Sequence, residues 1–176
     1  MDRSDRLECV NWILYEYKYF NLYPETACLA IHILERSAHA LPNFKDNKPY
    51  ITVAALFLAC KYEEINPPKL QQLIPENYKK YKEIILNYEK QILKAIDYRL
   101  TFPTLLSFVP EDVGSVNREY LIDILLISLT KEDFQNYHYI DIVGIAMKLI
   151  PQSQVLSCQG AQTKAVFQQP LLLANF

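Results

Sequence analysis

The chain has 176 residues, 51% of them apolar, which suits one ordinary domain or slightly more and allows a sizeable core. Its net charge is −2 and its lysines and arginines form no basic stripe, which argues against nucleic-acid binding because phosphate contacts need clustered cations. Only three glycines and little strand-like alternation predict an all-α fold, and no apolar run is long enough to cross a membrane.

The four cysteines show no CxxC spacing and indicate reduced thiols in an intracellular protein. We expect its location to be nuclear, cytoplasmic or both. They are Cys9, Cys28, Cys60 and Cys158. The charged N-terminus leads into no short apolar segment of the signal-peptide type.

The first predicted helix covers residues 4–20, with Asp2 or Ser4 as its N-cap. Its apolar stripe has helical spacing and leaves Trp12 towards one edge. The stripe consists of Leu7, Val10, Ile13, Leu14 and Tyr17. A turn leads to Pro24, which suits the first turn of a second helix over residues 24–40. That helix is expected to bury Ala27, Leu29, Ile31, Ile33 and Leu34.

After a loop marked by Pro42 and Pro49, the most apolar stretch of the sequence predicts a central helix over residues 50–63. From Ile51 to Cys60 it has no polar face, and a helix that is apolar all round is buried. Charge arrives at its C-terminal end in the run Lys61-Tyr62-Glu63-Glu64-Ile65-Asn66-Pro67-Pro68.

Two acids close this central helix at the end where the helix dipole disfavours them, by roughly 0.3–1 kcal/mol each. They are Glu63 and Glu64. This position leaves two interpretations open, a solvated helix end or a role outside local stability.

A short helical piece over 68–73 and a break at 75–77 precede a helix predicted over 79–96. Glu89 lies on the flank of the apolar stripe of that helix, and a partly buried carboxylate without a partner costs several kcal/mol. Lys61 is an available opposite charge. The two residues either form an internal ion pair or point to hydrogen-bonding groups on another molecule.

The remaining chain resembles a partial repeat of the first half. A linker over 97–103 is expected to be extended because Pro103 disfavours helix before it, and helical turns over 104–109 follow. Helices are predicted over 117–129 and 139–150. The stretch Ile140-Asp-Ile-Val-Gly-Ile-Ala-Met aligns with Ile51-Thr-Val-Ala-Ala-Leu-Phe-Leu, which indicates a duplicated helical fold whose second copy stops after three helices.

The last 26 residues, 151–176, have a different composition, rich in glutamine and with Lys164 as their one charge. We expect a weakly ordered tail there. The predicted organisation is therefore a first domain over 1–100, a partial second one over 101–150 and this tail.

The sequence carries no sign of an enzyme. It lacks phosphate-binding glycine loops, an HExxH pair and a GxSxG elbow. His32, His39 and His138 stand apart from any cysteine or carboxylate at metal-ligand spacing. We therefore expect no catalytic residues, no cofactor, no metal and no small-molecule ligand.

The motif Lys-Tyr-Glu-Glu-Ile-x-Pro-Pro after a small-residue apolar helix resembles the cyclin box. Further segments over residues 6–150 are similar to cyclins at the expected spacing, in particular to mitotic-type cell-cycle cyclins. They are Trp12, Pro24-Glu25-Thr26, Leu34-Glu35-Arg36, Tyr88-Glu89, Tyr98-Arg99-Leu100 and Phe102-Pro103-Thr104.

The resemblance implies a five-helix cyclin fold and a regulatory subunit that binds and activates a cyclin-dependent kinase. It implies that Lys61 and Glu89 hydrogen-bond the kinase main chain. The other implied contact residues are Leu58, Tyr62, Glu64, Ile65, Leu93, Tyr98 and Leu100. It also implies that Arg6 and Glu35 form a structural ion pair.

The chain departs from the family at the patch that docks Arg-x-Leu substrates. The family has apolar residues there, whereas this sequence has Asp5, Glu8 and Cys9, with Trp12 retained. The resemblance therefore makes such docking doubtful. Two alternatives stay open, a cyclin-fold module or decoy that binds without activating, and a transcription-type cyclin fold that meets DNA.

Overall fold

The computed structural model describes residues 1–74, 78–131, 133 and 136–150. Those residues form helices and connecting turns with no strand, which confirms the predicted all-α class. No helix within them is both long and apolar enough to span a membrane. The predicted break at 75–77 and the predicted tail over 151–176 lie outside the described residues.

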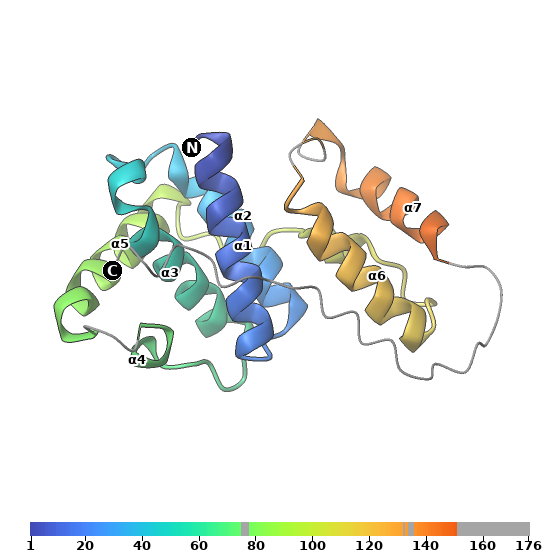
Figure 1. Cartoon of the computed structure of the whole chain (residues 1–176), viewed down its shortest axis with the longest axis horizontal. Helices are drawn as coiled ribbons and strands as arrows, with labels where there is room; N and C mark the ends of the chain where they lie inside the picture. Colours follow the sequence, from blue (N-terminus) through green and yellow to red (C-terminus); the bar gives the residue numbers. More distant parts are fainter. Residues whose placement is uncertain (75–77, 132, 134–135, 151–176) are drawn as a thin grey trace.

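The helices form two groups (Figure 1). The first lobe contains α1 (Arg3–Tyr19), α2 (Pro24–Ala38), α3 (Phe44–Glu63), α4 (Leu70–Leu73) and α5 (Tyr78–Ala95). The second lobe contains the 3-10 turn η1 (Leu105–Phe108), α6 (Ser115–Ser128) and α7 (Tyr139–Leu149).

Helix α3 is the centre of the first lobe and packs on α1, α2 and α5. From Ile51 to Leu56 every side chain is buried, as expected for a helix without a polar face. Small residues such as Ala54, Ala55 and Ala59 let the neighbouring helices approach closely. Packing on several sides therefore fixes the C-terminal end of α3, so the segment that begins at Lys61 reaches the surface at a defined place.

Helix α3 begins at Phe44, so the predicted loop through Pro49 was wrong for residues 44–49. Phe44 is buried, and the Lys48 ammonium is held by acids on α1. These tertiary contacts outweigh the backbone bond that a proline inside a helix cannot make. Asn43 starts the helix with a left-handed backbone, at φ 54°.

Helix α1 is capped by Asp2, whose Oδ1 accepts from the Asp5 amide at 3.0 Å. The predicted stripe of α1 was wrong at two positions. Leu7 is 43% exposed, whereas Trp12 is fully buried. The core covers more than one side of α1, because α2 and α3 both pack on it.

The connection between the lobes starts as a turn, so the prediction of an extended linker was wrong at its first two residues. Asp97 and Tyr98 have φ of 54° and 56°, a left-handed region that non-glycine residues seldom adopt. The lobes are also linked by Lys18 of α1, whose Nζ lies 2.9 Å from Asp123 Oδ1 of α6.

Candidate functional site

The two charges singled out by the sequence lie together at the surface where α3 meets α5. The Lys61 ammonium pairs with Glu89 and lies 4.5 Å from the centroid of the Phe57 ring. The Glu89 side chain is 14% exposed, but that of Lys61 is 37% exposed. The pair thus forms within the chain and keeps its ammonium in reach of another molecule.

Exposed apolar side chains lie on the segments that follow the two members of this ion pair along the chain. Tyr62 and Ile65 follow Lys61 along the chain, and Ile65 is 82% exposed. Tyr98, after α5, is 66% exposed and is presented by the left-handed turn described above. Large apolar side chains exposed in one region mark binding surfaces more often than single ones do.

The remaining apolar residues predicted at this surface are buried or half-buried and belong to the core. Leu58 is buried, and Leu93 and Leu100 are half-buried against the core. The Tyr62 hydroxyl is 2.8 Å from Thr101 Oγ1, which fastens the end of α3 to the inter-lobe segment. We refer to Lys61, Glu89, Tyr62, Ile65 and Tyr98 as the α3–α5 surface.

Glu64, one of the two acids at the end of α3, accepts hydrogen bonds from the start of α2, which accounts for its position. Its Oε1 accepts from the Tyr23 amide at 2.7 Å and from the Thr26 hydroxyl at 2.6 Å. These groups belong to the start of α2, where the helix dipole favours a negative charge. The acid that is misplaced on α3 is therefore well placed for α2, an interpretation that neither sequence-based alternative included.

Arg6 and Glu35 lie in direct contact. Arg6 Nε donates to Glu35 Oε1 at 2.8 Å, and Nη1 donates to the Leu129 carbonyl at 2.9 Å. Arg6 thus joins α1, α2 and the C-terminal end of α6, where carbonyl groups favour a cation. The contact to Leu129 links the two lobes and was not foreseen from the sequence.

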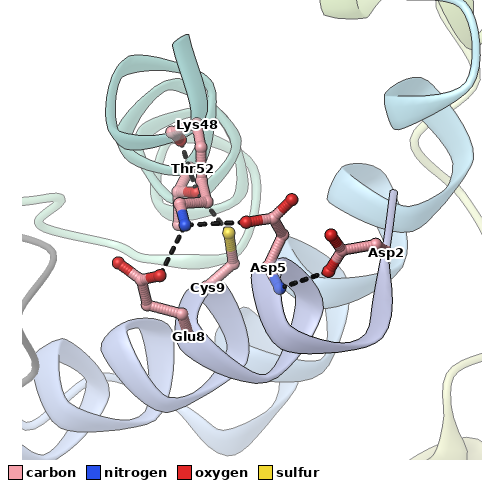
Figure 2. Close-up of polar contacts among 6 residues, drawn as sticks. All are labelled: Asp2, Asp5, Glu8, Cys9, Lys48 and Thr52. Atoms are coloured by element: carbon pink, nitrogen blue, oxygen red, sulfur yellow. Dashed lines mark hydrogen bonds and ion pairs between the residues drawn. The ribbon is translucent and has the colours of Figure 1, made fainter. Parts of the chain in front are cut away.

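Three of the four residues at the expected docking patch, Asp5, Glu8 and Cys9, make polar contacts within the chain (Figure 2). Lys48 reaches from α3 to α1, where its Nζ lies 2.9 Å from Asp5 Oδ1 and also contacts Glu8. The Thr52 hydroxyl donates to Cys9 Sγ at 3.1 Å. Cys9 and Trp12 are fully buried, so neither offers apolar surface at this place.

Lys48 is a residue that sequence reasoning missed. Asp5 and Glu8 stand three residues apart on α1, which places both carboxylates on one face and gives a signal that a cation should meet them. The sequence does not say which cation, because Lys48 is about forty positions away in the chain. Hydrogen bonds with Glu8 and Asp5 outweigh burial and raise the pKa of Lys48, so its charge is secure.

The buried thiols show no sign of reactivity. Burial raises the pKa of Cys9 and of Cys60 to about 12 and raises that of Cys28 as well. Among the described residues no three histidines, cysteines or acids gather as metal ligands would.

Comparison with known proteins shows which family this chain belongs to. Residues 1–101 match the family model of the cyclin N-terminal domain. The chain belongs to the cyclin family. This cyclin is 31% identical over 162 residues to Cyclin-B1-1 of Arabidopsis thaliana, covering 89% of this chain and 36% of that protein.

Two further relatives are also cell-cycle or meiotic cyclins. This cyclin is 38% identical over 106 residues to the meiosis-specific cyclin rem1 of Schizosaccharomyces pombe, covering 59% of this chain and 26% of that protein. It is 30% identical over 150 residues to the G2/mitotic-specific cyclin-B of Emericella nidulans, covering 80% and 30%. This cyclin therefore spans about a third of the length of the curated relatives it matches.

Proposed function

We propose that this cyclin is a regulatory subunit that binds and activates a cyclin-dependent serine/threonine kinase in cell-cycle control. The observation that carries the proposal is the α3–α5 surface, which combines a partly exposed ammonium with exposed apolar side chains on the segments that follow α3 and α5. The names of the relatives, which are mitotic and meiotic cyclins, support a cell-cycle role.

The ion pair prepares Lys61 and Glu89 for a partner's main chain. Glu89 holds the Lys61 ammonium in place before binding, and each side chain keeps further hydrogen-bonding capacity. Charge-assisted hydrogen bonds of this kind contribute about 1.5–3 kcal/mol each once water is excluded. Tyr62, Ile65 and Tyr98 would exclude that water.

Activation follows if the surface binds one kinase conformation and not the other. Moving a kinase from mostly inactive to mostly active takes about 5.5 kcal/mol of differential binding. The cyclin supplies no reacting group in this mechanism. It stabilises the conformation in which the kinase's own regulatory helix is swung in and its catalytic Lys–Glu pair is complete.

We also propose that Arg-x-Leu substrates do not dock on α1, because Lys48 and its acids occupy the expected patch and Trp12 is buried. An intracellular location, nuclear or cytoplasmic, is proposed on the three buried free thiols. Nucleic acid and membrane are not proposed as partners.

The test is co-purification of the full chain with a panel of cyclin-dependent kinases, followed by phosphorylation of a histone substrate. Binding with phosphorylation is expected. Binding without phosphorylation would favour a module or decoy that does not activate. Salt-dependent DNA binding without any kinase would favour the transcription-type alternative.

A further inference from the structure

One side of α7 carries an uncovered apolar stripe. Ile140, Gly144 and Met147 are four and then three residues apart, which places them in one row along the helix. Ile140 is 63% exposed and Met147 is 37% exposed. A Cβ placed on Gly144 would meet nothing within 4 Å, so the middle of the row is open.

Part of α7 is already packed, whereas Ile145 and Leu149, outside the stripe, are 46% and 61% exposed. Ile142, Val143 and Ala146 are buried, and α7 rests on α6 and η1. A helix with apolar residues on more than one side needs cover on more than one side. Within the described residues, the Ile140–Gly144–Met147 stripe has no such cover.

The internal repeat shows that the same stripe is covered in the first lobe. The aligned positions on α3 are Ile51, Ala55 and Leu58, and all three are buried. Helix α3 is packed by α5, which follows it in the chain. The part of the chain that follows α7 is residues 151–176.

We propose that the stripe on α7 is an internal docking site for residues 151–176. Of these 26 residues, 12 are apolar and only Lys164 is charged, a composition unlike that of solvated tails. The densest apolar groups are Val166-Phe167 and Leu171-Leu172-Leu173. Because the segment is tethered next to the stripe, its effective concentration there is of the order of millimolar.

The lengths fit this arrangement. Gly160 and Pro170 are helix boundaries by residue type and enclose a segment of nine residues, about 14 Å as a helix. Helix α7 has eleven residues and is about 16 Å long. The ten residue-to-residue steps from Ile150 to Gly160 span up to about 33 Å, enough for the chain to turn back along α7.

The experiment uses the full chain with its methionine methyl groups labelled with ¹³C. The chain has two methionines, Met1 and Met147, so the second reports on the stripe and the first is an internal reference. A neutral soluble gadolinium chelate is added and the relaxation enhancement of each methyl is measured. The variants are Val166→Ser with Phe167→Ser, and Gln168→Ser with Gln169→Ser as the matched control.

We expect the Met147 methyl to be shielded in the parent chain and in the glutamine variant. In the Val166→Ser/Phe167→Ser variant its enhancement should rise to that of a side chain 37% exposed, with Met1 unchanged. A Met147 methyl exposed equally in all three chains overturns the proposal. The proposal is also overturned if the Met147 methyl is shielded equally in all three chains and this shielding increases with protein concentration. That result would indicate that a second copy of the chain covers the stripe.

Discussion

Glu16 is buried on α1, 5% exposed, and no cation or hydrogen-bond donor meets its carboxylate among the described residues. Burial raises the pKa of Glu16 to about 7. Between the ordinary carboxyl pKa and that value, the folded chain keeps a proton that the unfolded chain releases. The free energy of unfolding therefore falls as the pH rises through this window.

Glu16→Gln removes the ionisable group and should cancel this fall. At about pH 8 we expect the variant to be more stable than the parent by about 1–3 kcal/mol, whereas at about pH 4 the two should agree closely. Urea unfolding at both pH values measures the difference. Glu119→Gln, on the exposed side of α6, is the control. An equal gain at both pH values would mean that the effect is not ionisation.

At the scale of single residues, the sequence showed which charged residues have a special position, but not always which residue each of them pairs with. Lys61 and Glu89 were singled out by position on their helices, and each is the other's nearest ion-pair partner in the fold. Lys48 was missed because its partners lie on another helix. The burial of Trp12 was missed because a single stripe cannot describe a helix that is packed on two sides.

Glu64 ties the end of α3 to the start of α2, so its effect belongs to the scale of helices. Glu64→Ala leaves the Tyr23 amide and the Thr26 hydroxyl without their acceptor. Loss of such a cap costs about 0.5–2 kcal/mol. Thermal unfolding followed by circular dichroism should show this loss.

The neighbouring acid provides the control for Glu64. Glu63 is half-buried at the end of α3 and caps no helix among the described residues, so Glu63→Ala should be close to neutral. Equal losses in the two variants would show that the cap on α2 contributes nothing specific.

At the scale of helices, periodicity and capping predicted the elements and most boundaries within a few residues. The exceptions have tertiary causes. Helix α3 runs back through Pro49 because Phe44 and Lys48 are held by the rest of the lobe. The left-handed turn at Asp97 and Tyr98 uses no glycine, so no residue type announced it.

Arg6 connects three helices across both lobes, so its removal should lower the stability of the whole molecule. Arg6→Ala removes the bonds to Glu35 and to the Leu129 carbonyl. Because Arg6 is 7% exposed while the Glu35 side chain is 30% exposed, we expect a loss of about 2–3 kcal/mol. In a chain of this size the melting temperature should fall by roughly 4–12 °C.

Lys18→Ala is the matched control, since Lys18 also links α1 to α6. Its pair with Asp123 is half exposed on both sides, and exposed pairs contribute about 0–1 kcal/mol. If the two variants melt at the same temperature, the buried contact of Arg6 does not hold the lobes together.

At the scale of the whole molecule, the all-α class and the cyclin family could be predicted from the sequence, because the box motif follows a helix without a polar face and further segments match cyclins at the expected spacing. The internal repeat between α3 and α7 was also visible. The contacts between the lobes could not be predicted, since they join single polar residues more than a hundred positions apart.

Kinase binding at the α3–α5 surface is measured most directly by calorimetric titration of a cyclin-dependent kinase with the parent chain, Lys61→Ala, Glu89→Ala and Lys45→Ala. Lys45 is an exposed lysine at the other end of α3 and serves as the control. We expect the Lys61 and Glu89 variants to weaken binding about 30-fold or more, equivalent to about 2 kcal/mol. Because Lys61→Ala leaves the 14% exposed Glu89 side chain without its ion pair, urea unfolding is used to establish that each variant is folded at the titration temperature. Affinities of those two variants that equal that of Lys45→Ala would contradict the proposed contact.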